Sequence, residues 1–372
     1  MAKALVLGRG ASGSAAAEEL RRRGFDVEFA EGLSLVVASP GIPVKSELQL
    51  GCEELKRRGW KLLAVTGSKG KSSVVKVVAD ALNLAGMKAV PCGNYGRPVC
   101  DLVGEEPGWA VVEVSSFQLE TTQLAGGTFE AAAVLNVQEE HLDRHGDMSV
   151  YHSLKHRLSS MAKVYFEGWG TEPSGEMESA GAFAGFDSLI AGSYFDNDIL
   201  RANGAYAVGL MRAAGLDDAA IARAFAAFEP LPHRFQLVAE IDGARYVDDS
   251  KATSIAALVA GVAMCGASPV RLIAGGKPKG DDPKNACPIL TERGKKVYLI
   301  GQSAESFAAA WKSAVDCEVC GTMEKAVEAA KRDAEKGETV LLSPGAASFD
   351  QFSNFGERGD VFAALVKKGK AQ

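Results

Sequence analysis

Residues 66–73 read Thr-Gly-Ser-Lys-Gly-Lys-Ser-Ser, and this stretch decides the fold of the central part of the chain. The apolar run at 62–65 before it is typical of a buried strand, and the apolar spacing from Val74 to Leu82 after it is typical of a helix. A glycine-rich turn between a strand and a helix points backbone N–H groups at phosphate oxygens, at the positive end of the helix dipole. The stretch therefore predicts a site for a nucleoside triphosphate.

The same turn supplies side chains to the predicted site. Lys71 can reach the outer phosphates, and the hydroxyl of Ser72 can hold Mg²⁺. The usual phosphate-loop pattern has a further glycine at the position of Val65, so a turn that only caps a helix is the alternative. The order of strand, Gly-Lys-Ser and helix favours the phosphate site. We assign nucleotide binding to Gly67, Ser68, Lys69, Gly70, Lys71, Ser72 and Ser73.

The composition narrows the class of protein. With 372 residues, 47% of them hydrophobic and 24% charged, the chain has the profile of a soluble globular protein of two or three domains. A net charge of −6 argues against nucleic acid as a partner. Seven cysteines are too few for a disulfide framework, and Cys317 and Cys320 are interpreted as ordinary thiols. We expect a cytoplasmic monomer with neither a secretory signal nor a membrane span.

The pattern of apolar runs predicts an α/β protein of three domains. Residues 1–60 are expected to form a small Rossmann-like domain, with strands at 3–8, 26–29 and 36–41. Its pattern G-x-G-x-x-G, from Gly8 to Gly13, could bind NAD, another nucleotide diphosphate or nothing.

The other two domains are expected to follow at 61–232 and 233–372. The central domain is predicted to have strands at 62–66, 110–114 and 131–136, helices at 71–86 and around 149–162, and an apolar helical period over 199–228. The last domain alternates strands and helices, which predicts a mainly parallel, doubly wound sheet. Its expected strands are 237–241, 244–248, 270–274, 297–300 and 338–342, and its helices are 253–265, 304–313, 323–336 and 357–368.

Two predicted strands of the central domain end in polar side chains. Glu113 follows three apolar residues, and a carboxylate at that end of a strand, beside the phosphate loop, would help to bind Mg²⁺. His141 follows the next strand and could ligate a metal through its neutral imidazole. The alternatives are a solvated glutamate and a structural histidine. Lys155, judged by its own neighbours, would be a solvated helix lysine.

Three loops of the last domain are rich in cations, glycine and hydroxyl groups. They are residues 246–254, 272–281 and 341–358. Lys251 and Thr253 suit a second anion better than a helix cap alone. Lys279 and Ser348, with backbone amides, could hold a small acid.

Taken in order, these motifs resemble the Mur-ligase family of ATP-dependent amide-bond-forming enzymes. The strings that carry the resemblance are T-G-S-K-G-K-S, E-V-S-S-F-Q-L-E, N-V-Q-E-E-H-L-D-R-H, P-H-R-F, D-D-S-K-A-T and L-S-P-G-A-A-S-F-D-Q-F-S-N-F. They run through nearly the whole chain, and the last two together are specific to the branch that adds D-glutamate. The resemblance implies a UDP-binding first domain, a central P-loop ATPase domain and a C-terminal domain for the amino acid. It implies transfer of D-glutamate to UDP-N-acetylmuramoyl-L-alanine through an acyl phosphate, in peptidoglycan precursor synthesis.

The resemblance also implies roles for single residues. Lys71, His141, Lys155 and Lys251 would be catalytic. Two Mg²⁺ ions would be held by Ser72 and Glu113 and by His141 and a carbamylated Lys155, whose reaction with CO₂ needs a neutral amine and a lowered pKa. ATP would also be contacted by Asn203, Arg234, Asp249 and Lys251. The UDP site would include Gly10, Ala11, Ser12, Gly13 and Ser39, the sugar-peptide would touch Asn94 and Gln118, and D-glutamate would bind Thr253, Lys279, Ser348 and Phe355.

Other functions remain open from the residues. The chain could be another Mur-type ligase or a folylpolyglutamate-synthetase-like ligase, which a substrate panel would separate. Because the first domain is short, a nucleotide-binding scaffold without catalysis is a second alternative. A dehydrogenase would rest on G-x-G-x-x-G alone and would leave Gly-Lys-Ser and Asp-Asp-Ser-Lys unexplained.

Overall fold

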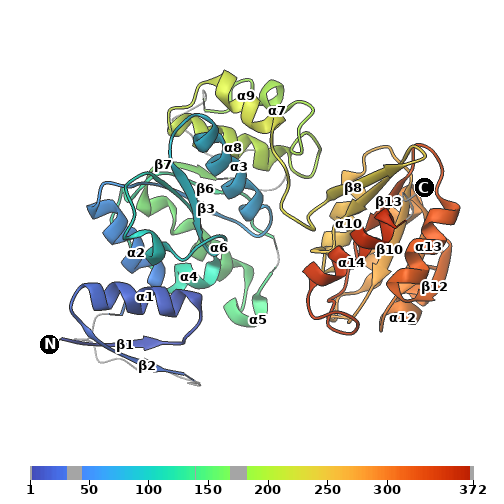
Figure 1. Ribbon diagram of the computed structural model, residues 1–372, viewed down its shortest axis with the longest axis horizontal. Coiled ribbons are helices and arrows are strands. Elements are labelled where there is room, and N and C mark those ends of the chain that lie inside the picture. The colour runs from blue at the N-terminus through green and yellow to red at the C-terminus, as the bar shows by residue number, and fades with distance from the viewer. Residues whose placement is uncertain (1, 32–43, 139, 168–181, 369–372) are drawn as a thin grey trace. The chain divides into compact units, whose positions relative to one another are not determined.

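The computed structural model describes residues 2–31, 44–138, 140–167 and 182–368 (Figure 1). Within these ranges the chain forms two compact units, Met1–Phe228 and Glu229–Gln372. The predicted α/β class with parallel sheets is confirmed. The predicted strand at 36–41, and Ser39 within it, lie outside the described residues. The proposed domain boundaries after residues 60 and 232 stay predictions.

A small parallel sheet opens unit 1. Strands β1 (Lys3–Leu7) and β2 (Asp26–Ala30) pair side by side, and helix α1 (Ala11–Arg22) connects them. A Cβ atom on Gly13 would lie 2.1 Å from the carbonyl oxygen of Gly8. The last glycine of the fingerprint is therefore needed for the close packing of α1 on the strand that precedes it.

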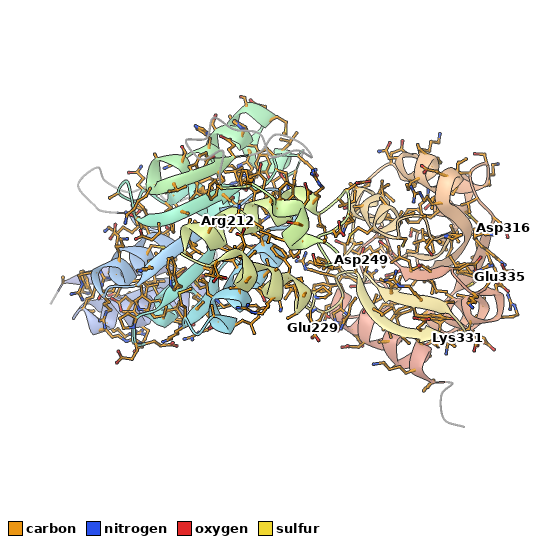
Figure 2. The ribbon with its side chains drawn as sticks, turned by 90° about the horizontal axis from the view of Figure 1, so that it is seen from above. Arg212, Glu229, Asp249, Asp316, Lys331 and Glu335 are labelled. Carbon is orange, nitrogen blue, oxygen red and sulfur yellow. The ribbon has the colours of Figure 1, made fainter. Side chains whose placement is uncertain are left out.

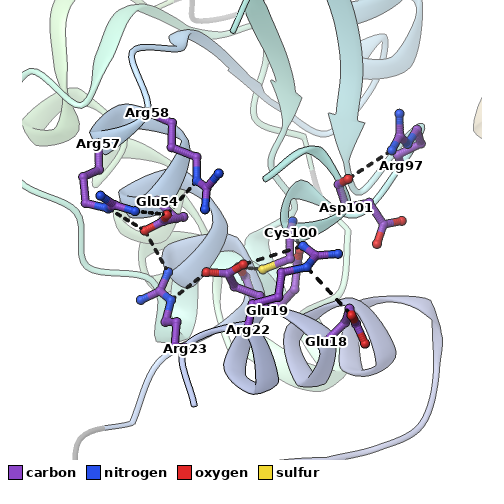
Figure 3. Close-up of polar contacts among 11 residues, drawn as sticks. Glu18, Glu19, Arg22, Arg23, Glu54, Arg57, Arg58, Arg97, Cys100 and Asp101 are labelled. Carbon is purple, nitrogen blue, oxygen red and sulfur yellow. Dashed lines mark hydrogen bonds and ion pairs between the residues drawn. The ribbon is translucent and has the colours of Figure 1, made fainter. Parts of the chain in front are cut away.

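Helix α2 (Glu47–Arg57) joins the small sheet to the rest of unit 1. Its Glu54 accepts hydrogen bonds from Arg57 and from Arg58 at the end of the same helix, and from Arg23, which follows α1 (Figure 3). The bonds from Arg57 and then Arg58 hold the pKa of the Glu54 carboxyl at about 2. The ionised carboxylate therefore fastens α1 to α2 at neutral pH.

The central sheet of unit 1 is parallel and has the order β4-β5-β3-β6-β7. Its strands are β3 (Lys61–Thr66), β4 (Ala89–Gly93), β5 (Trp109–Glu113), β6 (Phe129–Val134) and β7 (Ala162–Glu167). In the register, Val65 pairs with Glu113, and Thr66 pairs with Val134. The loops that leave β3, β5 and β6 therefore start beside one another, at the edge where parallel sheets bind ligands.

The described helices that follow β3 in unit 1 are α3 (Lys71–Leu84), α4 (Ser116–Thr121), α5 (Leu142–His145), α6 (Met148–His156), α7 (Phe186–Ile190), α8 (Arg201–Ala213) and α9 (Asp218–Ala226), with 3₁₀ turns η1 (Val99–Leu102) and η2 (Ser159–Met161). The helices predicted for this part of the chain are present, but α4, α5 and α7 occur in addition, and the region 199–228 divides into α8 and α9. Helix α3 packs against α8 and α9 (Figure 1). The predicted helix at 149–162 is wrong at its end, because α6 stops at His156 and the chain passes through η2 into β7.

Unit 2 has a sheet of order β12-β11-β10-β13-β9-β8, parallel except for the β8–β9 hairpin. The strands are β8 (Gln236–Ile241), β9 (Ala244–Asp248), β10 (Val270–Gly275), β11 (Gly294–Ile300), β12 (Cys317–Gly321) and β13 (Thr339–Leu342). The helices are α10 (Ile255–Met264), α11 (Cys287–Arg293), α12 (Ala304–Trp311), α13 (Met323–Asp333) and α14 (Phe355–Lys367), with the 3₁₀ turn η3 (Pro283–Ala286). Apolar clusters lie on both faces of the sheet, as a doubly wound fold requires. The predicted, mainly parallel arrangement is confirmed.

All seven cysteines lie in the described ranges and are free thiols. Cys52 and Cys92 are fully buried in the core of unit 1, and Cys265 is buried in unit 2. Burial raises the pKa of the Cys92 thiol and raises that of Cys265 to about 12. Across the described ranges, no helix combines the length and apolar character needed to cross a membrane.

Candidate active site

The phosphate loop lies between β3 and α3, as the sequence predicts. Gly67 and Gly70 have φ values of 149° and 83°, which favour glycine, and α3 begins at Lys71. The Lys71 ammonium donates to the carbonyl oxygens of Gly67 at 2.8 Å and of Ser68 at 3.0 Å. Lys71 is therefore folded back over its own loop at the N-terminus of α3, where phosphate oxygens bind in such loops.

Asn203 of α8 lies directly against the phosphate loop. A Cβ atom built on Gly70 would be 2.1 Å from the side-chain nitrogen of Asn203, which is itself buried. The fold thus brings Asn203, one of the expected ATP contacts, to the loop across more than a hundred residues of sequence.

Replacing Gly70 with alanine should weaken ATP binding by at least about tenfold, because the new methyl group would both strain a left-handed backbone and push Asn203 away. Titration calorimetry with ATP measures the effect. Gly86→Ala is the matched control, because Gly86 has φ +78° but nothing within 4 Å of its Cβ position. Equal ATP affinities of the two variants would contradict this role of Gly70.

Asn136 holds the phosphate loop from the other side, and the sequence reasoning did not single it out. Its side-chain oxygen accepts from the Lys69 N–H at 2.8 Å, and its side-chain nitrogen donates to the Lys69 carbonyl at 3.0 Å. Its backbone carbonyl accepts from the N–H of Ser68. A side-chain amide at the end of the strand next to the loop was the signal that could have indicated this role.

Glu113 ends β5 and is 2% exposed. Its Oε1 accepts from the side-chain nitrogen of Asn94 at 2.7 Å, whereas Oε2 is buried without a hydrogen-bond partner among the described residues. A buried carboxylate oxygen is costly unless a donor or a cation satisfies it, so Glu113 fits a role in binding Mg²⁺. In the described ranges, no group of three or more His, Cys, Asp or Glu side chains is arranged to hold a metal. A cation at Glu113 therefore needs other ligands, such as hydroxyl or phosphate oxygens.

Lys155 lies beneath the phosphate loop, with 1% of its surface exposed. Its ammonium donates to the Gly67 carbonyl at 2.9 Å and lies 4.4 Å from the centre of the Tyr151 ring. Burial, and then the charge of Lys71, lower the pKa of Lys155 to about 7. A large fraction of Lys155 is therefore neutral near pH 7, the state that reacts with CO₂. Only the family resemblance had indicated this residue.

His141 precedes α5 and is exposed, with its ring 5.0 Å from that of Phe117 on α4. Gln118, on the same helix, uses its side-chain oxygen to accept from the N–H and hydroxyl of Ser115 and so caps α4. The side-chain nitrogen of Gln118 is the group that could bind a substrate.

In unit 2, the residues expected to bind the amino acid follow neighbouring strands. Thr253 accepts from the ammonium of Lys279 at 3.0 Å. The ammonium of Lys251 lies 4.1 Å from the centre of the Phe355 ring, and burial lowers its pKa. Ser348 is buried in the loop after β13. The structure thus pairs Thr253 with Lys279 and Lys251 with Phe355.

Asp249 and Arg234, both expected to contact ATP, lie in adjoining turns of unit 2. Asp249, labelled in Figure 2, accepts from the N–H of Phe235 at 3.2 Å and from the hydroxyl of Ser343 at 3.1 Å. Burial raises its pKa to about 7. Arg234 stands between His233 and Phe235, which both have left-handed backbone conformations. Asp249 therefore also has a structural role.

Residues 8–10 join β1 to α1, and Ala11, Ser12 and Gly13 form the first turn of that helix, as expected for a nucleotide-binding fingerprint. Glu31, directly after β2, accepts from the N–H of Arg9 in this loop at 3.1 Å. A carboxylate at the end of the second Rossmann strand commonly binds a ribose hydroxyl. The position of Glu31 directly after the second strand could have indicated this residue from the sequence, but it was not singled out.

Comparison with known proteins shows to which family the chain is related. Residues 65–165 match the Mur ligase middle domain, and residues 233–345 match the Mur ligase, glutamate ligase domain. The UDP-N-acetylmuramoylalanine–D-glutamate ligase of Nitratidesulfovibrio vulgaris is 38% identical over 341 residues, which cover 89% of this chain and 77% of the relative. The chain belongs to the Mur ligase family.

A further relative and a solved structure support the same family and fold. The enzyme of the same name from Chlamydia caviae is 30% identical to this Mur ligase over 413 residues, 98% of this chain and 97% of the relative. The crystal structure of MurF ligase from Thermotoga maritima in complex with ADP shares the fold, with a TM-score of 0.62 at 16% identity, covering 98% and 95% of the two chains. The predicted family, fold and enzyme class, a carbon–nitrogen ligase, are confirmed. ATP dependence follows from the same family membership.

The predicted site residues of this Mur ligase fall unevenly on the matched ranges. Lys71, Glu113, His141 and Lys155 lie within the middle-domain match. Arg234, Asp249, Lys251, Thr253 and Lys279 lie within the glutamate ligase domain, whereas Ser348 and Phe355 follow its last matched residue. The individual roles of all these residues stay predictions.

Proposed function

We propose that this Mur ligase joins D-glutamate to UDP-N-acetylmuramoyl-L-alanine in peptidoglycan precursor synthesis, as a cytoplasmic monomer. The observation that carries the reaction type is the meeting of Lys71, Lys155 and the phosphate loop within hydrogen-bond distance of the Gly67 carbonyl. The choice of substrates is supported by the relatives at 30–38% identity, which carry this activity in their names.

In the proposed reaction, the terminal carboxylate of the UDP substrate attacks the γ-phosphorus of ATP, and ADP leaves. The amine of D-glutamate then attacks the carbonyl carbon of the acyl phosphate, and the tetrahedral intermediate expels phosphate as the amide forms. Lys71 and the backbone N–H groups of the loop stabilise charge on the transferred phosphoryl group. The protein contributes mainly the positioning of reactants and the neutralisation of charge.

We further propose two Mg²⁺ sites in unit 1. Ser72 and Glu113 would hold one ion, which fits the buried Glu113 Oε2. His141 and carbamylated Lys155 would hold the other, which fits the lowered pKa of Lys155. When bound, Mg²⁺ would supply positive charge to phosphoryl oxygens. Carbamylation joins the neutral Lys155 amine to the carbon of CO₂ with loss of one proton, and it gives the side chain two carboxylate-like oxygens.

The remaining predicted residues are proposed as binding groups. UDP would bind at Gly10, Ala11, Ser12, Gly13 and Ser39, and the sugar-peptide at Asn94 and Gln118. ATP would bind at the phosphate loop, Asn203, Arg234, Asp249 and Lys251. D-Glutamate would bind at Thr253, Lys279, Ser348 and Phe355. D-Glutamate carries two carboxylates, and its proposed site offers the ammonium of Lys279, which donates to the Thr253 hydroxyl at 3.0 Å.

Arg358 should set the affinity for D-glutamate without touching it. The fully buried guanidinium donates to the Ser250 hydroxyl at 3.0 Å, the Ser250 carbonyl at 2.8 Å and the Ala346 carbonyl at 3.1 Å, and so ties together the loops after β9 and β13. Arg358→Met should raise the KM for D-glutamate by about tenfold or more, with a smaller change in the KM for ATP. Arg271→Met, which breaks the buried ion pair with Glu338, is the control for lost stability. Equal KM values for D-glutamate in the two variants would contradict the assignment.

A phosphate-release assay tests the proposed function. ATP is supplied with UDP-N-acetylmuramoyl-L-alanine alone, with D-glutamate alone and with both, and release is expected only with both. L-Glutamate and other amino acids in place of D-glutamate should give no release. Release with a different amino acid would favour another Mur-type activity, and ATP binding without release under any combination would favour a scaffold.

A further inference from the structure

The carboxylate of Glu120 connects helix α5 to helix α4. Glu120 of α4 accepts two hydrogen bonds from Arg144, at 2.7 Å to Oε2 and 3.2 Å to Oε1. The Nδ1 atom of His145 lies 3.2 Å from the same Oε1. Arg144 lowers the pKa of Glu120, so the carboxylate is ionised and can only accept. His145 therefore lies against the same carboxylate oxygen that Arg144 binds.

His145 extends this connection into the core. It is buried, its Nε2 lies 3.0 Å from the Ser116 hydroxyl, and its ring stacks on that of Tyr151 with centres 5.3 Å apart. Ser116 is only 3% exposed, so the line from Glu120 through His145 to Ser116 is a structural tie and presents no nucleophile to solvent. The tie joins α4, α5 and α6.

His141 stands at the end of this tie. It has φ 58° and ψ 29°, a left-handed conformation that costs a non-glycine residue about 1 kcal/mol or more and persists only where its surroundings impose it. Its carbonyl oxygen accepts from the N–H groups of Arg144 at 3.1 Å and His145 at 3.0 Å. The two residues that fix the backbone of His141 are thus the two that hold Glu120.

We propose that Glu120 is a positioning residue for His141. Through Arg144 and His145 it fixes α5, and α5 fixes the direction in which His141 presents its exposed imidazole. The inference rests on the proposed function, because it takes His141 to act on the groups bound at the phosphate loop. Glu120 itself needs no contact with substrate.

Kinetics of Glu120→Gln give the first test, because this change keeps the shape and removes the charge. We expect kcat to fall by about 10- to 100-fold, as a displaced catalytic group causes, with the KM for ATP unchanged. Glu130→Gln is the matched control. Glu130 is 21% exposed, against 23% for Glu120, and it also binds two cations, Lys56 and Lys163. A kcat of Glu120→Gln within twofold of the control would overturn the proposal.

A double-mutant cycle separates positioning from general support of the fold. If Glu120 acts through His141, then Glu120→Gln should cause no further loss of kcat in a His141→Ala background. Full multiplication of the two losses would show that Glu120 acts independently of His141 and would overturn the proposal.

Hydrogen exchange provides a readout that needs neither metal nor substrate. In Glu120→Gln, the backbone amides of Arg144, His145 and Gly146 should exchange faster than in the wild type, while those of α3 stay protected. Unchanged exchange at these three amides would overturn the proposal. Wild-type protein that releases no phosphate with both substrates would refute the proposed function, and the exchange measurement would still decide whether Glu120 fixes α5.

Discussion

Replacement of Lys71 with alanine is expected to abolish ATP-dependent phosphate release, with a loss of at least about 10²–10³-fold in kcat. The Lys71 ammonium lies over the phosphate loop, within 3.0 Å of the carbonyl oxygens of Gly67 and Ser68, so it is placed to reach the outer phosphates. Without it, negative charge that develops on the transferred group would lack its partner. A coupled assay for ADP, with both substrates present, measures the loss.

Lys76→Ala controls for the loss of a lysine from the same helix. Lys76 pairs with Asp80 one turn further along α3, at 2.6 Å, and an i, i+4 pair on a helix contributes about 0.3–0.5 kcal/mol. Its turnover should stay within about twofold of the wild type. Wild-type turnover in Lys71→Ala would remove the assignment of the phosphate loop.

Replacement of Lys155 should have the second largest effect. Lys155→Met and Lys155→Arg should both lose about 10²-fold or more in kcat, because neither side chain can form a carbamate and the guanidinium of arginine stays charged. Wild-type protein prepared without CO₂ should lose activity and regain it with bicarbonate, whereas the variants should not respond. Labelling with ¹³CO₂ and carbon NMR should show a carbamate signal that disappears in both variants. Full activity of Lys155→Met would refute the assignment.

The pH dependence of stability gives an independent check on Lys155. Its pKa is about 7 in the folded protein, against an ordinary 10.5. Between these values the unfolded chain binds a proton that the folded chain does not, so this residue makes the free energy of unfolding rise with pH across that window. The slope is at most about 1.4 kcal/mol per pH unit. In CO₂-free buffer, denaturant titrations should show this slope in the wild type relative to Lys155→Met.

Short sequence patterns predicted correctly those helices, strands and loops whose residues are adjacent in the sequence. The phosphate loop, β3 and α3 follow from one run of glycine, lysine and apolar spacing. Strands β4, β7 and β12 were missed. The sequences of β4 and β12, Ala-Val-Pro-Cys-Gly and Cys-Glu-Val-Cys-Gly, are short and end in glycine. Each is held at the edge of a sheet by pairing with one neighbour, which is tertiary information.

Local sequence patterns were also insufficient to predict several residues of the candidate site. Lys155 reads as a solvated lysine in its own helix, but the fold buries it beside Gly67 and Tyr151. Burial, and then the charge of Lys71, lower its pKa. Gly67 and Lys71 are both distant from Lys155 in sequence. Asn136 likewise acts through a loop almost seventy residues away. Such roles depend on which loops the sheet brings together, and the sequence predicts the sheet without its register.

The reactivity of the buried cysteine thiols can report the rate at which each unit unfolds. Cys52 and Cys92 are sealed in unit 1 and Cys265 in unit 2, and burial disfavours their reactive thiolate forms. An alkylating reagent can therefore modify them only during transient unfolding of the surrounding core. Mass spectrometry of peptides from timed labelling would give a separate unfolding rate for each unit, without any engineered probe.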